Sequence, residues 1–342
     1  MTKDQGVGSR RRAATLDDVA KHAGISKYTV SRILNGLSPG PVKGTRVSAA
    51  TQQAVLQAAQ DLQYRPNVLA RSLLERRTNV IGLYSGPRNQ FHSSMFGSNL
   101  MDGFQEGIDE AQVDLLLYGT LGQRSSESIY NSLANGKVDG LILYTKADDP
   151  VLPKLKMSHL PLVAVADVLE GVPSVVVDDY AGGRLLAEYL FERGHRRIIY
   201  RSSLRSLESS HRRLLGIQDV ADPLGMDIDV VPAVGALTEH EIALVTRGTG
   251  RVTAIVGWCD AIAYAAIDNL KRHGLSVPGE VAVCGFDGLP SETKPAQQLT
   301  TIRAPWSDVG KKAISTLMHL IDNPEVADVT TLPVDLIIGD TA

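Results

Sequence analysis

Five polar side chains near the start of the chain have the chemistry needed to contact DNA. Lysine and arginine donate hydrogen bonds to guanine and to phosphate oxygens, and hydroxyl groups bond to bases or phosphates. Such side chains can read a DNA sequence only if one rigid element presents them together, and a helix over 26–34 would do so. The five are Lys27, Tyr28, Thr29, Ser31 and Arg32.

The residues before them predict a short helix that begins after Thr15 and ends at Gly24. Thr15 is a hydroxyl N-cap, and Asp18 three residues later makes a carboxylate variant of the capping box. Gly24 ends the helix because glycine adopts a left-handed turn without steric cost. The apolar stripe of this helix consists of Leu16, Val19, Ala20 and Ala23.

A second predicted helix is capped by Ser26 and buries Val30, Ile33 and Leu34, which leaves the five polar side chains facing outward. Two short helices joined by an Ala-Gly-Ile turn form a helix-turn-helix unit, whose second helix enters the major groove of DNA. We therefore predict a DNA-binding protein. A purely structural helical hairpin is the alternative, and the motifs that follow disfavour it.

Two further stretches extend this pattern. Residues from Thr51 to Leu62 predict a third helix that packs against the first two. The stretches TLDDVAKHAGIS, TVSRILNG and YRPNVLARSL, in this order, resemble the lactose/galactose repressor (LacI/GalR) family of bacterial regulators. The resemblance implies further DNA-contacting residues, namely Leu16, Ser26, Asn35, Asn67, Ala70 and Leu73.

Residues 67–79 are expected to form a hinge helix and linker. A helix as short as 67–73 is marginal in water, so the segment is either a permanently folded linker or one that orders only on DNA. The resemblance implies the second, because in the family this hinge becomes helical in the minor groove. Leu73 matches the leucine that wedges into a central base step there, and Leu74 stands where the family carries a polar or basic residue.

Charge is distributed unevenly along the 342 residues. Residues 1–79 hold 13 Lys and Arg against 5 Asp and Glu, and the remainder holds 22 against 33, although the net charge is only -3. A basic head on an acidic body is typical of a module that neutralises phosphates joined to one that does not.

We expect 1–14 to be a disordered basic arm. The Gly- and Pro-rich loop 36–47, longer than in the family, is either solvated or in contact with phosphates, and we favour phosphate contact.

The composition also limits where the protein works. No apolar run approaches the ~20 residues needed to cross a bilayer, and the basic N-terminus lacks the hydrophobic core of a signal peptide. Cys259 and Cys284 lie in apolar, strand-like runs and are expected to be buried small hydrophobes in a reducing compartment. We therefore expect a protein of the bacterial cytoplasm, associated with the nucleoid and not with a membrane.

From Val80 onward, predicted strands alternate with predicted helices, the pattern of a parallel α/β sheet. The second half repeats this architecture. Motifs such as SVVVDDYAGGRLLAEYLFERGHRRI and GLSVPGEVAVCGFD resemble the family's core, which is similar to periplasmic sugar-binding proteins. The expected fold is an all-α helix-turn-helix domain at 15–66, with its motif at 16–35, followed at 80–342 by two doubly wound parallel-sheet lobes. In such a protein the ligand lies at the carboxyl ends of the strands.

Four charged residues at or near these strand ends are candidate effector contacts. Carboxylates and an arginine suit the paired hydroxyls of a sugar, since each bridges neighbouring OH groups with charge-assisted bonds. The four are Asp167, Arg213, Asp260 and Asp287. For Asp260, capping of the following helix is an equal alternative.

Aromatic residues and one departure from the family complete the candidate effector site. Cys259 stands where the family often has an asparagine, which puts the usual sugar contact there in doubt. Trp258 either stacks on a sugar ring or lies in the core. Phe91 and Phe96 are expected to face the cleft and to cover a ligand ring.

We found no catalytic motif. HEIAL at His240 lacks the second histidine of a zinc site, and GTG at Gly248 precedes a strand instead of following one. We therefore expect no cofactor, no metal and no enzyme activity.

The sequence predicts a regulator that binds a palindromic DNA operator as a homodimer, with a small-molecule effector, expected to be a carbohydrate. The alternatives are a purine-type, corepressor-dependent regulator, a sugar-binding transport or sensor protein, and a sugar-processing enzyme.

Overall fold

The computed structural model divides the chain into two compact units, residues 1–78 and 79–342. Each unit is considered by itself. The residues that the structure describes are 13–34, 47–66, 72, 76–86, 94–118, 124–204, 207–233, 235–248, 250–290, 297–323 and 328–342.

The described residues of the first unit include three helices, α1 (Leu16–Ala23), α2 (Lys27–Leu34) and α3 (Ala49–Asp61). The predicted capping box at Thr15 is present, and Gly24 takes the predicted left-handed conformation with φ of 66°. The third helix begins two residues earlier than predicted, because the Ser48 hydroxyl accepts a hydrogen bond from the Thr51 amide and caps it. The three helices meet at a small core in which Val19, Val30 and Val55 are fully buried.

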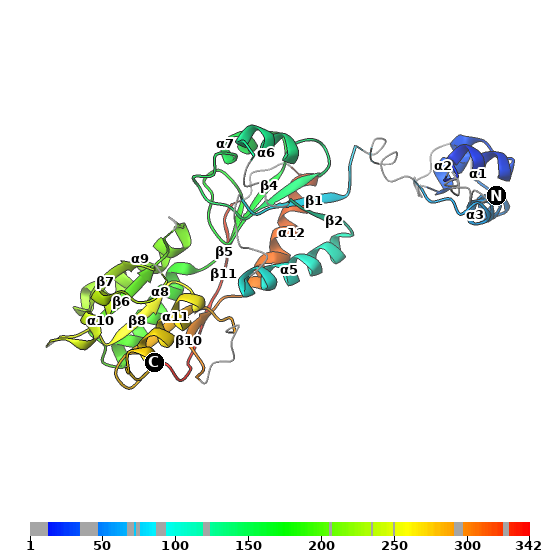
Figure 1. The fold of residues 1–342 in the computed structure, drawn as a ribbon. Helices are drawn as coiled ribbons and strands as arrows, with labels where there is room; N and C mark the ends of the chain where they lie inside the picture. Colours follow the sequence, from blue (N-terminus) through cyan, green and yellow to red (C-terminus); the bar gives the residue numbers. More distant parts are fainter. Residues whose placement is uncertain are drawn as a thin grey trace, which may run out of the picture. The chain divides into compact units, whose positions relative to one another are not determined.

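The second unit contains two six-stranded sheets, one in each lobe (Figure 1). The first sheet has the order β11-β5-β4-β3-β1-β2, with all strands parallel. Its strands are β1 (Val80–Tyr84), β2 (Asp114–Leu117), β3 (Gly140–Leu143), β4 (Leu162–Val165), β5 (Ser174–Val177) and β11 (Thr330–Leu332). The helices of this lobe are α5 (Met95–Ala111), α6 (Ser126–Leu133), α7 (Leu152–Lys156) and α12 (Trp306–Asp322).

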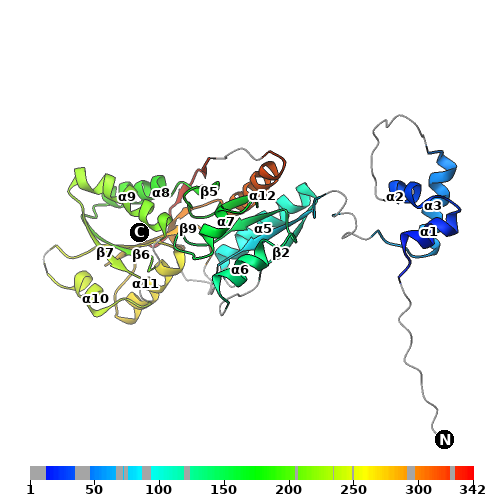
Figure 2. The same cartoon turned by 90° about the horizontal axis from the view of Figure 1, so that it is seen from above.

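The second sheet has the order β12-β10-β9-β8-β6-β7, and only the edge strand β12 runs antiparallel to its neighbour. Its strands are β6 (Arg197–Ser202), β7 (Asp227–Pro232), β8 (Ala254–Gly257), β9 (Ala282–Asp287), β10 (Thr300–Arg303) and β12 (Asp335–Ile337). Figure 2 shows α8 (Asp179–Glu192) and α9 (Glu208–Leu224) on one side of it, and α10 (Glu239–Thr246) and α11 (Asp260–Arg272) on the other. The predicted fold class is therefore confirmed.

Apolar side chains point to both faces of each sheet, because successive residues of a strand alternate between the two faces, and helices cover both. Ile198 and Tyr200 of β6 belong to the apolar core beneath α8 and α9, whereas Ile199 between them packs with α10 and α11. In the first lobe, Leu83 faces α5 and α12, and Tyr84 faces α6 and α7. Side chains that alternate between two buried faces are the pattern of a parallel sheet covered by helices.

Some elements differ from the prediction. Helix α5 begins at Met95 instead of Ser98, because the Ser94 hydroxyl accepts a hydrogen bond from the Gly97 amide. The sequence pattern did not identify α7, β10, α12, β11 or β12. As a result, three crossings between the lobes, at Asp178, 304–305 and 333–334, became visible only in the structure.

Paired glycines bring helices unusually close in each lobe. On α8 and α9, a Cβ at Gly183 would overlap the Arg213 carbonyl, and a Cβ at Gly216 would overlap the Tyr180 carbonyl. The same arrangement recurs where α12 (orange) lies beside α5 (cyan) in Figure 1, with Gly103 against the Ser307 carbonyl. The contact at Gly183 is made by the backbone carbonyl of Arg213. It therefore also fixes the position from which the Arg213 side chain leaves α9.

We expect Gly183→Ala to lower the free energy of unfolding by ~1–3 kcal/mol, because the added methyl group must push α9 away from α8. Glu192→Ala, on the exposed side of the same helix, is the matched control and should have little effect. Urea denaturation measures both. An effect of Gly183→Ala no larger than that of the control would contradict the close packing.

Candidate functional site

Helix α2 presents the polar side chains singled out above. Tyr28 is 73% exposed, and the Lys27 side chain is 60% exposed. The Arg32 guanidinium carbon lies 5.8 Å from the centre of the Tyr28 ring, so the two form a cation–π pair along the helix. The Ser26 hydroxyl accepts a hydrogen bond from the Thr29 amide at 3.3 Å, as expected for the residue that caps this helix.

The remaining predicted DNA contacts have different outcomes. Leu16 is partly buried and packs against the core of the first unit, so its apolar surface is mostly used by the fold. Ser31 lies on α2 beside Arg32 and is half-buried. Four predicted contacts lie outside the described residues: Asn35, Asn67, Ala70 and Leu73.

A second cluster lies in the other unit, at the carboxyl ends of β6, β8 and β9. The chain enters the second sheet at β6 and then adds β7 on one side and β8 on the other, so the crevice between β6 and β8 is a topological switch point. In α/β folds, ligands bind at this position. Helix α9 follows β6 and carries Arg213, and α11 follows β8 and begins at Asp260.

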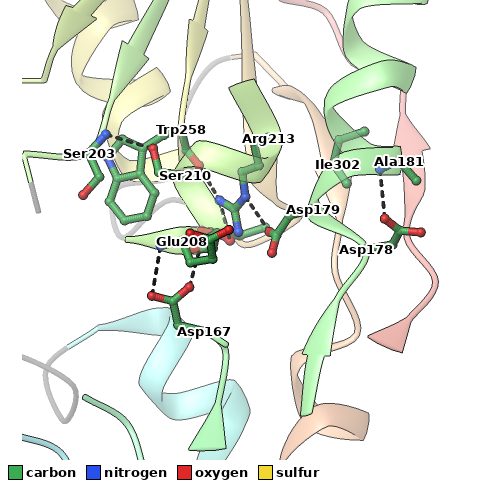
Figure 3. Close-up of polar contacts among 12 residues, drawn as sticks. Asp167, Asp178, Asp179, Ala181, Ser203, Glu208, Ser210, Arg213, Trp258 and Ile302 are labelled. Carbon is green, nitrogen blue, oxygen red and sulfur yellow. Dashed lines mark hydrogen bonds and ion pairs between the residues drawn. The ribbon is translucent and has the colours of Figure 1, made fainter. Parts of the chain in front are cut away.

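Arg213 is at the centre of this cluster and is only 3% exposed (Figure 3). Its Nε donates to Asp179 Oδ1 at 2.8 Å, and one terminal nitrogen donates to the backbone carbonyl of Trp258. The same nitrogen lies 4.0 Å from Asp287 Oδ1, and the guanidinium carbon lies 3.6 Å from the centre of the Phe286 ring. The guanidinium group therefore joins β9, α8 and the end of β8.

Asp287 has an unusual backbone and an unusual side-chain environment. Its φ is 128°, a conformation that side-chain-bearing residues rarely adopt and that tends to occur at functional sites. Burial raises the pKa of its carboxyl well above the ordinary value, although the nearby Arg213 charge opposes this. The indole N–H of Trp306 also lowers the pKa, yet this nitrogen is buried and has no hydrogen-bond partner among the described residues. The buried indole N–H of Trp306 and the carboxyl group of Asp287, whose backbone is strained, thus lie near each other without a direct hydrogen bond.

Asp260 is engaged differently from the cap proposed for it. The N-cap position of α11 is Cys259, and Asp260 is the first helical residue. Its carboxylate accepts hydrogen bonds from the Leu289 amide at 2.7 Å and from the Thr301 hydroxyl. The alternative that Asp260 caps its own helix is therefore wrong. Instead, it ties α11 to β10 and to the turn after β9.

The two cysteines also differ in position. Cys284 is buried within β9, as expected, whereas Cys259 lies after β8 and is partly exposed. The pKa of the Cys259 thiol is raised to about 12, mainly because the sulfur is buried and to a lesser extent because the Asp287 charge is nearby. Its thiol is therefore neutral and has no amide donor to replace that of an asparagine.

Asp167 lies after β4 of the first lobe but binds the second lobe. Its two carboxylate oxygens accept hydrogen bonds from the backbone amides of Ser209, at 2.7 Å, and Glu208, at 3.2 Å (Figure 3). These amides open α9, so Asp167 caps a helix of the opposite lobe from a distance of 41 residues in sequence. Burial raises the pKa of Asp167 to about 6, although the two amide hydrogen bonds lower it.

Aromatic rings lie on both sides of this region. Phe96 contacts Trp306 edge-on, with ring centres 4.7 Å apart, and Tyr144 at 5.5 Å. Trp258 is partly buried, and its ring lies 5.9 Å from the Arg213 guanidinium carbon, so it borders both the core and the cluster. Phe91 lies outside the described residues.

Sequence reasoning missed two central residues, Asp179 and Trp306. Asp179 appeared only as the last residue of the run SVVVDD, directly before a predicted helix, and nothing in its neighbourhood indicates that Arg213 is its partner. Trp306 opens α12, whose buried positions Val309, Ala313, Ile314 and Leu317 recur at helical spacing. That periodicity could have predicted helix α12 from the sequence.

The pKa of Asp167 leads to a test of its contact with the second lobe. The folded-state pKa is raised, so the folded protein binds more protons than the unfolded chain between about pH 4 and 6, and stability falls as pH rises through this range. Asp167→Asn removes the buried charge and keeps a hydrogen-bond acceptor. Its stability relative to wild type should therefore rise between pH 4 and pH 7, by at most about 3 kcal/mol.

Thermal unfolding of both proteins across this pH range measures the difference. Asp260 and Asp287 titrate in both proteins, so their contributions cancel. A difference that does not change with pH would show that the Asp167 carboxyl is not desolvated.

Within the described ranges, no group of three or more His, Cys, Asp or Glu side chains is arranged to hold a metal ion. None of the helices in those ranges is long and apolar enough to cross a membrane.

Comparison with known proteins identifies the family of the chain. Residues 15–67 match the family of bacterial regulatory proteins, lacI family, and residues 187–342 match the periplasmic binding protein-like domain. An HTH-type transcriptional regulator of Mycolicibacterium smegmatis is 31% identical, covering 92% of this chain and 91% of its own. The regulator CelR of Thermobifida fusca is 30% identical, covering 96% of both chains.

Solved structures show the same fold. The lac repressor dimer bound to operator and an anti-inducer has a TM-score of 0.79 at 24% identity, covering 96% of this chain and 99% of its own. The complex of CelR with cellobiose has a TM-score of 0.67 at 26% identity, covering 96% and 100%. These relatives are transcriptional regulators and not enzymes. The chain belongs to the LacI family of bacterial transcriptional regulators, with a helix-turn-helix DNA-binding head and a periplasmic binding protein-like domain.

Proposed function

We propose that this regulator is a repressor that binds a palindromic operator as a homodimer and responds to a carbohydrate effector. The observation that carries the effector assignment is the group formed by Asp287 and Arg213 of the second lobe together with the unpaired Trp306 indole at the start of α12 in the first lobe. We further propose that the protein works in the bacterial cytoplasm, at the nucleoid. We infer no catalytic role, since the relatives are regulators.

The chemistry of the cluster favours a polyhydroxylated ligand. A sugar hydroxyl can donate to the Asp287 carboxylate and accept from the Trp306 N–H, which would satisfy a donor that is buried without a partner. Trp258 and Phe96 supply apolar ring faces of the kind that pack against a sugar ring. CelR, which binds cellobiose, supports this class of ligand.

The contact between the lobes offers a route for the effector to act. Asp167 of the first lobe binds the amino end of α9, and Arg213 on the same helix belongs to the proposed effector site. A ligand that binds better when the lobes are closed shifts the population toward the closed state. We propose that this shift alters the hinge at 67–79 and thereby the affinity of the heads for DNA.

In the head, Arg32 is the proposed reader of a guanine. Arg32→Ala should weaken binding to the preferred operator by ~1–3 kcal/mol and relax selectivity at one guanine. Selection from a random duplex pool, followed by affinity measurements on the selected duplexes, tests this. Lys312→Ala, which removes a cation from the second unit, is the control. Equal weakening on every duplex would make Arg32 a phosphate contact.

In the second unit, Asp287→Asn should lower effector affinity at least tenfold and abolish the effector response, while operator binding stays near that of wild type. A thermal-shift screen of wild type against mono- and disaccharides, cellobiose included, and against nucleobases identifies the ligand, because a bound ligand stabilises the folded state. Calorimetry then compares the variant with Asp335→Asn, a control in an exposed ion pair with Arg303. Unchanged affinity in Asp287→Asn would remove Asp287 from the site, and a response to nucleobases alone would favour the purine-type alternative.

A further inference from the structure

We propose that Asp17 is a positioning residue that holds the Lys27 ammonium on the base-reading face of α2 and away from the phosphate backbone. The inference rests on the proposed DNA-binding role of α2 and names a residue that sets its selectivity. It concerns two side chains of the head that the capping and packing of α1 and α2 do not explain.

The two acidic residues at the start of α1 make different contacts. Asp18 completes the capping box with Thr15, so its carboxylate serves the helix itself. The Oδ2 atom of Asp17 lies 2.9 Å from Nζ of Lys27, which is ten residues later and is the first residue of α2. An acid in the first turn is favoured by the helix dipole, but the dipole alone does not explain a bond to another helix.

Stability of the head is a weak reason for this ion pair. Both side chains are more than half exposed, at 55% for Asp17 and 60% for Lys27. Exposed pairs of this kind contribute little to folding, because water screens the attraction and two long side chains lose freedom. The pair gains importance only where water is displaced, as it is when α2 enters a groove.

Near DNA the carboxylate limits what the lysine can bind. A lysine is a compact charge on a flexible stem, and the nearest strong partner on any duplex is a phosphate, whatever the sequence. Asp17 repels phosphates and holds the ammonium near the amino end of α2, where the recognition helix of such a motif meets base edges. Lys27 then adds little to binding of arbitrary DNA and retains its donors for a base.

The second cation of α2 has a similar arrangement. The Arg32 guanidinium lies over the Tyr28 ring, so it too has a side-chain partner, in this case on its own helix. Both cations predicted to read bases are thus held by neighbouring side chains before DNA arrives.

The test uses the full-length chain and a labelled random-sequence duplex, with binding followed by fluorescence anisotropy over a range of salt concentrations. Asp17→Asn should bind the random duplex several-fold more tightly. The slope of log affinity against log salt should steepen by about 0.9, the value of one additional phosphate contact. In a Lys27→Met background, the same Asp17→Asn change should leave the slope unchanged.

Asp61→Asn is the matched control, because it removes one negative charge from the same head, at the end of α3, where Asp61 lies 3.5 Å from His22. Selection from a random pool provides a second measurement, in which Asp17→Asn and Lys27→Met should lose preference at the same base pair. The proposal is overturned if Asp17→Asn acts equally with and without Lys27, or if Asp61→Asn has the same effect. Failure of wild type to bind any duplex would instead overturn the DNA-binding function on which the inference rests.

Discussion

A guanidinium group cannot be buried without carboxylates or carbonyls beside it, and two are buried among the described residues of the second lobe. Arg201 on β6 is fully buried, pairs with Glu241 at the start of α10, and also bonds to two loop carbonyls. Arg213 is held by Asp179 and lies near Asp287. An unpaired charge in such a place costs several kcal/mol, so these pairings fix which elements meet. In the case of Arg213, they bring α8, α9 and β9 to one point, which is also the place where a ligand would bind.

The close helix crossings allow this arrangement. Without a Cβ at Gly183 and Gly216, the backbones of α8 and α9 touch, and Arg213 starts close enough to the amino end of α8 to reach Asp179. In the first lobe, α5 and α12 make the same kind of close backbone contact at glycines. Helix α12 places Trp306 on the opposite side of the candidate site. Small residues far from the ligand thus determine where the polar groups that face it can lie.

The parts of this structure that sequence could predict are those specified by neighbours in the chain. Thr15, Asp18 and Gly24 delimit α1 through bonds that span only a few residues, and strands β1 to β9 follow from their apolar runs. The contacts of Asp167 and Asp260 could not be foreseen, because their partners are amides and a hydroxyl 29 to 42 residues away. Strands β11 and β12 have three residues each and exist only because the edges of completed sheets accept them.

The late position of α12, β11 and β12 also bears on how the protein is made. Both lobes take elements from residue 300 onward: the first lobe needs α12 and β11, and the second needs β10 and β12. Neither sheet can therefore be completed while the ribosome is still translating the middle of the message. The three described helices of the head end at Asp61, and the described residues of their apolar core all lie before residue 65. During synthesis a nascent chain therefore has its DNA-binding helices long before it has a ligand sensor, and control by the effector begins only when the last strands are in place.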